Sequence, residues 1–161
     1  MATFVQRLLE AGTIQVGAAA ADWESSLRAG GELMVNAGFC EQRYVEAMIR
    51  NHKEIGPYFI IAPGIAMPHA KPEEGVLKTG YALLTLTEPV EFGDEENDPV
   101  DLLIFAGAAN REEHNQEAVP QIAELCDSDE FIEKLRSAKD QAGAEAVLRE
   151  FEAALLAGEL E

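Results

Sequence analysis

The sequence has few basic residues, few cysteines and no long apolar run. Only 12 Lys and Arg stand against 30 Asp and Glu, so the formal net charge is −18. Such a charge repels a phosphate backbone and an anionic membrane surface, and it disfavours nucleic acid as a partner. It would attract a basic protein partner, although a well-solvated acidic surface explains it equally well. No run approaches the roughly 20 apolar residues of a membrane-spanning helix.

The N-terminal segment offers no clear secretory signal. Arg7 and the alanine-rich stretch 17–21 resemble one loosely, but Glu10 and Gln15 interrupt the apolar core that a signal requires. We therefore expect a soluble, mature, cytoplasmic protein.

Motifs for cofactors and metals are also missing. Cys40 and Cys126 are the only cysteines and have no neighbouring Cys or His at ligand spacing, so they predict neither a disulfide framework nor a zinc site. We interpret both as small core residues. The sequence contains no GxxxxGK(S/T) or GxGxxG loop, which disfavours a nucleotide kinase. We expect no cofactor and no metal.

Helical and strand patterns alternate along the chain, whose 161 residues suit one domain. The segment 100–106 is apolar at nearly every position, as expected of a strand covered on both faces. We predict an α/β fold over residues 1–161: a single three-layer sandwich with a central mixed sheet of about five strands and helices on both faces. We expect 58–62, 81–86 and 100–106 to be neighbouring core strands. Gly30 and Gly31 weaken the predicted helix 23–37. Close helix packing is one explanation for them, and we favour the other, simple tolerance.

His69 follows the predicted strand 58–62 in a loop that two prolines constrain. Proline fixes φ near −65° and restricts the residue before it, so Pro68 and Pro72 leave the backbone around His69 few conformations. The residue types alone leave a functional histidine and an ordinary loop histidine open. The position beyond a strand favours the functional one, because binding groups in α/β proteins often lie there.

His114 lies near the start of the helix that follows the strand 100–106. It precedes Ala118 by four residues, which predicts the inward face of that helix and leaves a core histidine open. The helix start also presents free N–H groups and the positive end of the dipole, which suit an anion. We expect His69 and His114 to meet over one shallow depression that suits phosphate, one imidazole as nucleophile and the other stabilising the transferred group.

The third histidine, His52, falls near the C-terminal end of the predicted helix 41–54. A cationic histidine interacts favourably with the helix dipole at that end. We therefore interpret His52 as structural.

Several segments resemble one known family. The run 65–70 (IAMPHA), together with 110–125 carrying His114, is similar to the mannitol/fructose type of EIIA domain of the bacterial phosphoenolpyruvate-dependent sugar phosphotransferase system. The segments 56–64 (GPYFIIAPG), 72–76 (PEEGV), 78–80 (KTG) and 97–101 (NDPVD) are most similar to the L-ascorbate branch. The resemblance extends over essentially the whole chain.

The resemblance implies a phosphoryl carrier that serves sugar uptake, here of L-ascorbate. It implies that the phosphocarrier protein HPr phosphorylates His69, that His114 is its active-site partner, and that the group passes to a cysteine of an EIIB component. The membrane component EIIC would take part only indirectly, and a homodimer is left open. A regulatory phosphorelay protein of the same fold, not dedicated to a transporter, is the alternative.

The sequence departs from this family at one position. Mannitol-type members carry an arginine in the second helix, and Asn51 stands at that place here. No arginine role carries over, and Arg50 or Lys71 is left as a candidate to compensate.

Overall fold

Two antiparallel strands, β4 (Gly80–Val90) and β5 (Val100–Gly107), form the middle of the sheet in the computed structural model, which describes residues 3–158. β1 (Ile14–Ala18) pairs in parallel with β4, and β3 (Ile65–Ala66) pairs in parallel with β5. β2 (Ile60–Ala62) pairs with β3 in the antiparallel sense, so the strand order is β1-β4-β5-β3-β2.

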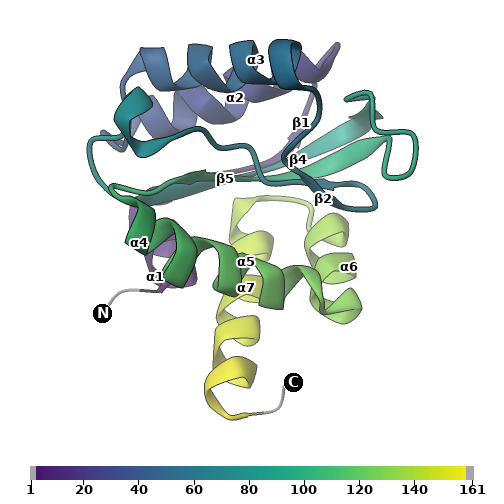
Figure 1. The fold of residues 1–161 in the computed structure, drawn as a ribbon. Helices are drawn as coiled ribbons and strands as arrows, with labels where there is room; N and C mark the ends of the chain where they lie inside the picture. The colour runs from purple at the N-terminus through teal and green to yellow at the C-terminus, as the bar shows by residue number, and fades with distance from the viewer. Residues whose placement is uncertain (1–2, 159–161) are drawn as a thin grey trace.

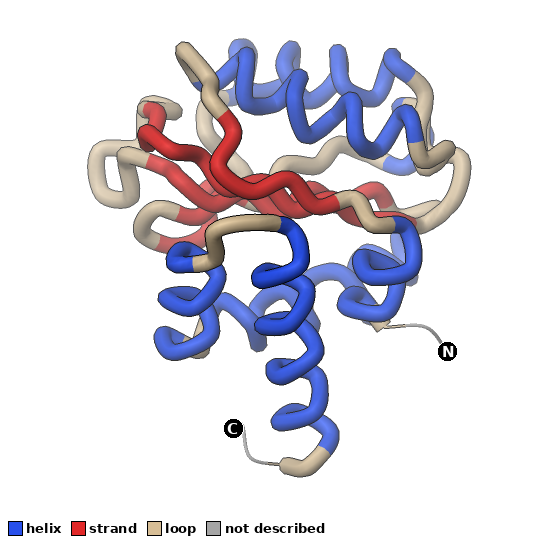
Figure 2. Tube along the Cα trace, turned by 180° about the vertical axis from the view of Figure 1, so that it is seen from behind, coloured by secondary structure: helices blue, strands red, loops and turns tan. Residues whose placement is uncertain are grey.

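Helices cover both faces of this sheet (Figure 1). One face carries α2 (Trp23–Asn36) and α3 (Gln42–Ile55). The other face, seen again from behind in Figure 2, carries α1 (Phe4–Ala11), α5 (Val119–Cys126), α6 (Asp129–Ser137) and α7 (Gln141–Leu156). The predicted three-layer α/β sandwich is confirmed. Within residues 3–158, no helix has the length and apolar character needed to cross a membrane.

Alternate residues of β5 supply two separate cores. Leu102 and Ile104 pack on the side of α1, α5 and α7, whereas Leu103 and Phe105 pack on the side of α2 and α3. All four side chains are fully buried. Burying one such side chain contributes about 1.5–3 kcal/mol to folding stability, so β5 is a main source of that stability. The prediction that this strand is covered on both faces is confirmed.

The prediction that 58–62 is a core strand beside the other two is wrong. Only Ile60–Ala62 form a strand, this strand lies at the edge of the sheet, and Ile61 is 43% exposed. The two-residue strand β3, which the sequence analysis did not predict, separates it from β5. Phe59 explains part of the apolar run, because it is buried in the turn before β2.

The interpretation of Gly30 and Gly31 as merely tolerated is also wrong. A Cβ atom on Gly30 would lie 2.0 Å from the Phe105 ring, and one on Gly31 would lie 2.6 Å from the Val45 side chain. Both distances are impossible without movement of the neighbour. Glycine is therefore what allows α2 to approach β5 and α3 this closely.

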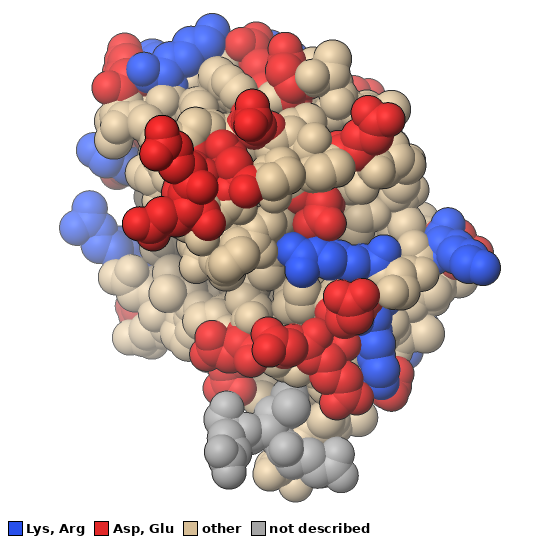
Figure 3. Space-filling view, turned by 90° about the vertical axis from the view of Figure 1, so that its right-hand side faces the viewer, with Lys and Arg blue, Asp and Glu red and all other residues tan. Residues whose placement is uncertain are grey.

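The end of the sheet that carries the β4–β5 hairpin is strongly acidic. Figure 3 views this end and shows Asp and Glu side chains over much of its surface, with fewer Lys and Arg between them. Within the hairpin, the Asp98 carboxylate accepts the backbone N–H groups of Phe92, Gly93 and Asp94 at 2.8–3.0 Å. This carboxylate therefore shapes its loop as well as adding charge.

Candidate active site

The structure brings His69 and His114 together. His69 follows β3 and His114 follows β5, and because these two strands are parallel neighbours, their carboxyl ends open at the same edge of the sheet. The two imidazole rings lie 5.0 Å apart between centroids, with their planes inclined by 37°. Both rings line one pocket of about 500 Å³. The two histidines thus share one depression, as the sequence analysis predicted.

Hydrogen bonds from neighbouring strands fix the backbone around His69. The N–H of Met67 donates to the Phe59 carbonyl at 2.8 Å, and the Pro68 carbonyl accepts the N–H of Ala106 at 3.0 Å. The Tyr58 hydroxyl donates to the His69 carbonyl. The loop therefore has little freedom on either side of the histidine.

One buried tyrosine, Tyr44 of α3, fixes the residue that follows. Its hydroxyl donates to the Ala106 carbonyl at 2.7 Å and accepts the N–H of Ala70 at 2.9 Å. Burial raises the pKa of Tyr44, so the hydroxyl keeps its proton and remains a donor. Through this one hydroxyl, α3 and β5 both hold the loop that carries His69.

The His69 ring itself makes one backbone hydrogen bond. Its Nδ1 lies 2.8 Å from the Met67 carbonyl oxygen. A carbonyl oxygen only accepts, so Nδ1 must carry the proton, and the neutral ring then has its lone pair on Nε2. The nitrogen that is free to react is therefore Nε2.

His114 lies in an irregular turn rather than in a regular α-helix. The segment begins with α4 (Arg111–Glu113), continues as the π-helix η2 (His114–Ala118) and then becomes α5. The Val119 N–H donates to the His114 carbonyl, five residues back, and Pro120 follows with no N–H to give. Pro120 therefore lies in the first turn of α5, where a missing N–H costs no hydrogen bond within the helix.

A π-helical turn contains one residue more than an α-helical turn, and this changes the predicted orientation of His114. Four-residue spacing places two side chains on one face only in a regular α-helix. Here Ala118 is fully buried, whereas the His114 side chain is half-buried and lines the pocket with His69. The prediction that His114 lies on the inward face with Ala118 is wrong, because the π-helical turn separates the two.

The start of this helical segment is also less open to an anion than predicted. The Asn110 side chain already accepts the N–H of Glu113 at 2.8 Å. Glu112 and Glu113 place two carboxylates in the same turn. The cap occupies one N–H group and the two carboxylates repel an anion. The histidines and the nearby cations therefore attract an anion more strongly than the helix start does.

Both site histidines are neutral at pH 7. Burial lowers the pKa of His69 and of His114 below the usual value of about 6.5, and for His114 repulsion from a charged His69 adds to the effect. The unfolded chain therefore takes up these protons first as the pH falls below about 6.5. Their contribution to folding stability is fully present above that pH and decreases below it.

Two cations line the pocket, Lys71 and Arg111. Arg50 is instead paired with Glu74 at 2.8 Å, and Asn51 lies 3.4 Å from the same carboxylate. Sequence reasoning offered Arg50 and Lys71 as substitutes for the family arginine and missed Arg111. The signal for Arg111 was its place in the 110–125 segment, three residues before His114.

His52 lies outside the pocket and its environment is structural, but not for the predicted reason. Its Nε2 lies 2.8 Å from the Phe92 carbonyl, and its ring packs 4.0 Å from the Trp23 ring between centroids. Burial lowers the pKa of His52, so the ring is neutral and the expected interaction of a cation with the helix dipole is absent.

Comparisons with known proteins agree with this geometry. Residues 7–151 match the family described as phosphoenolpyruvate-dependent sugar phosphotransferase system, EIIA 2. The ascorbate-specific PTS system EIIA component of Escherichia coli K12 is 41% identical over 134 residues, which are 83% of this chain and 87% of that protein.

Two solved structures extend the comparison to three dimensions. A crystal structure of a PTS IIA (PtxA) from Streptococcus mutans, described as putative, has 33% identity, a TM-score of 0.87 and coverage of 95% of this chain and 97% of that one. The IIA chain in a complex of enzyme IIAMTL with phosphorylated enzyme IIBMTL from E. coli has 31% identity and a TM-score of 0.74. The match covers 85% of this chain and 94% of that one.

The family match, together with the similarity in sequence and fold, defines a component of a sugar phosphotransferase system. The chain belongs to the type 2 EIIA family of the phosphoenolpyruvate-dependent sugar phosphotransferase system.

The hydrogen bonds of the histidines predict opposite tautomers for His69 and His52. ¹⁵N NMR of the imidazole nitrogens at neutral pH should show the proton of His69 on Nδ1 and the proton of His52 on Nε2, because each of these nitrogens faces a carbonyl oxygen. His52 serves as the internal control for the assignment. A His69 that carries its proton on Nε2 would contradict the geometry described here.

Proposed function

We propose that Nε2 of His69 accepts a phosphoryl group from HPr and passes it to a cysteine of an EIIB component, in the uptake of L-ascorbate. The observation that carries this proposal is the bond from His69 Nδ1 to the Met67 carbonyl, which leaves the lone pair on Nε2. The 41% identity to an ascorbate-specific component supports the choice of sugar. The complex that contains a phosphorylated IIB supports the choice of acceptor.

Each step exchanges one bond to phosphorus for another. In the first step the lone pair of His69 Nε2 attacks the phosphorus of phosphorylated HPr, and the donor atom of HPr leaves with the electron pair. In the second step a thiolate of EIIB attacks the same phosphorus, and His69 leaves as neutral imidazole. The proton on Nδ1 stays in its hydrogen bond to Met67 throughout, so neither step needs a proton to move within His69.

His114 stabilises the phosphoryl group as it moves. A neutral imidazole has one N–H to donate, and a donor fixed in advance beside the developing charge costs no reorganisation during the reaction. Lys71 and Arg111 add positive charge at the same pocket. Both cations are exposed, so salt and water screen them, which suits a site that must also release the group.

The surface around the pocket suits a protein donor and a protein acceptor. Ile55 and Tyr58 line the pocket, and their side chains are 71% and 36% exposed. Exposed apolar and aromatic side chains beside a reactive group are typical of a protein contact surface. HPr and EIIB would therefore use this surface in turn.

Truncation of the two site histidines should have different effects. His69→Ala should abolish labelling by phosphoenolpyruvate and HPr, because the nucleophile is gone. His114→Ala should lower the rate of transfer roughly 10²-fold with the fold intact, since it removes one donor in the transition state. His114→Gln, which keeps a donor, should recover part of that rate.

Rapid-quench labelling, with thermal unfolding to check the fold, measures these rates. The control is His52→Gln, because a buried histidine truncated to alanine would leave a cavity. Labelling of His69→Ala, or a wild-type rate for His114→Ala, would refute the assignment. Transfer onward to EIIB supports the transport function, whereas a phosphorylated His69 that EIIB does not discharge would favour the regulatory relay.

The arginine at the pocket should matter more than the arginine in the second helix. Arg111→Gln should slow phosphorylation by roughly tenfold, because it removes a charge from the pocket that receives the phosphoryl group. Arg50→Gln is the matched control and should change the rate little, because Arg50 already pairs with Glu74 at the surface. Equal rates for the two variants, measured by the same labelling assay, would remove Arg111 from the site.

A further inference from the structure

The turn that carries His114 also carries a buried carboxylate. Glu117 is only 6% exposed. Its Oε2 accepts the Nε–H of Arg7 at 2.9 Å and the hydroxyl of Tyr81 at 2.6 Å, and its Oε1 accepts an Nη2–H of Arg7 at 3.3 Å. Three hydrogen bonds from two side chains therefore engage both oxygens of this one group.

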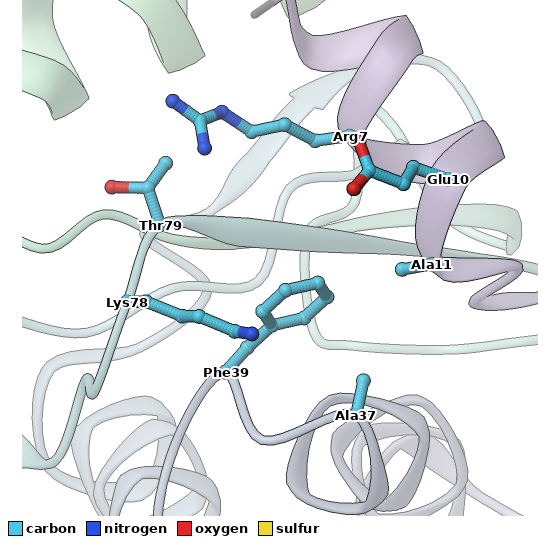
Figure 4. Close-up of a pocket in the computed structure, with 7 residues that line it drawn as sticks. All are labelled: Arg7, Glu10, Ala11, Ala37, Phe39, Lys78 and Thr79. Carbon is cyan, nitrogen blue, oxygen red and sulfur yellow. The ribbon is translucent and has the colours of Figure 1, made fainter.

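The two partners of Glu117 come from elements far away in the sequence. Arg7 belongs to α1 and Tyr81 to β4, on the side of the sheet where η2 lies. Figure 4 shows Arg7 reaching away from α1 with its guanidinium on the side of Thr79, while the Glu10 carboxylate lies near the base of the Arg7 side chain. The guanidinium is therefore directed to Glu117 and not to the acid on its own helix.

The surroundings of Arg7 and Tyr81 keep both of these partners protonated. Burial lowers the pKa of Arg7, but the hydrogen bond and charge of Glu117 outweigh it and raise the pKa overall. Burial and the same carboxylate raise the pKa of Tyr81. Both partners stay protonated, as donors to a carboxylate that has almost no access to water.

A second contact holds the beginning of the same segment. The Thr79 hydroxyl donates to Glu113, the residue directly before His114, and accepts the N–H of Ala109 at 2.9 Å. The π-helical turn is thus held on both sides of His114. Such turns are rare and commonly occur at functional sites, where the surrounding structure maintains them.

We propose that Glu117 is a positioning residue for phosphoryl transfer: bound by Arg7 and Tyr81, it holds the π-helical turn so that the His114 ring stays 5.0 Å from the His69 ring. Glu117 does not line the pocket, and its hydrogen bonds go to Arg7 and Tyr81 and not to either ring. It therefore acts through His114, and this inference rests on the function proposed above for His114. Its consequence is that a contact between α1 and η2, away from the pocket, sets the rate of transfer.

The test is Glu117→Gln, made in the wild-type protein and in the His114→Ala variant. In the wild type it should lower the rate of transfer from HPr by about tenfold, because small displacements of a catalytic group have large effects on rate. In the His114→Ala background it should cause no further loss, since two residues that act as one unit are not additive. A purely structural role would lower the rate equally in both backgrounds.

The matched control is Asp101→Asn. Asp101 forms an ion pair with Arg136 at 3.0 Å, in which the carboxylate is more exposed than that of Glu117, at the start of β5 and outside the pocket. It should leave the rate unchanged. Imidazole ¹⁵N spectra of the unphosphorylated proteins provide a readout besides activity: Glu117→Gln should shift the signals of His114 and leave those of His52 in place, and Asp101→Asn should shift neither.

Separate outcomes identify which proposal fails. A wild-type rate for His114→Ala refutes the proposed role of His114, and this inference with it. A slow His114→Ala together with either a wild-type rate for Glu117→Gln or equal losses in both backgrounds refutes this inference alone. If Glu117→Gln fails to fold, Tyr81→Phe replaces it in the same comparison, and because it deletes one hydrogen bond it should lower the rate about threefold in the wild type only.

Discussion

The hydrogen bond between His69 Nδ1 and the Met67 carbonyl is the contact on which the site depends. It decides which nitrogen carries the proton and therefore which one is free to react. The bond exists only because the backbone of Met67 is itself held by Phe59, and because β3 is paired with β5. A strand of two residues between two longer elements is thus what orients the imidazole.

The electrostatics of the site suit a group that is received and then given away. The protein has a formal net charge of −18, and the end of the sheet seen in Figure 3 carries several patches of carboxylates. Around the pocket, two neutral histidines and two exposed cations provide a local environment that accepts an anion. No buried cation lines this pocket among residues 3–158, and a buried cation would bind phosphate more firmly than exposed ones do.

The sequence predicted the parts of the fold whose signals are local. The apolar run of β5 and the position of each site histidine beyond a strand follow from neighbouring residues. The family resemblance then supplied the assignment of the pair, and the comparisons confirm the family.

What the sequence could not predict depends on contacts between distant residues. Phe105 makes a Cβ on Gly30 impossible, and nothing near Gly30 in the sequence indicates this. The one additional residue in the π-helical turn changes the face on which His114 lies. The spacing of apolar residues in α5 does not reveal this turn, because the turn lies before α5 begins. Nothing near Glu117 in the sequence distinguishes it from the other acids, because the partners that bury it, Arg7 and Tyr81, are far away in the sequence. Likewise, only the pocket that Arg111 shares with His69 indicates a functional role for Arg111.

The central claim is that phosphate is carried on Nε2 of His69, and NMR of the phosphorylated protein tests it most directly. After labelling with phosphoenolpyruvate and HPr, coupling between ³¹P and the imidazole ¹⁵N identifies the phosphorylated nitrogen. We predict coupling to Nε2 of His69, with Nδ1 still protonated and hydrogen-bonded to Met67. Phosphorus on Nδ1 of His69, or on His114, would contradict this account.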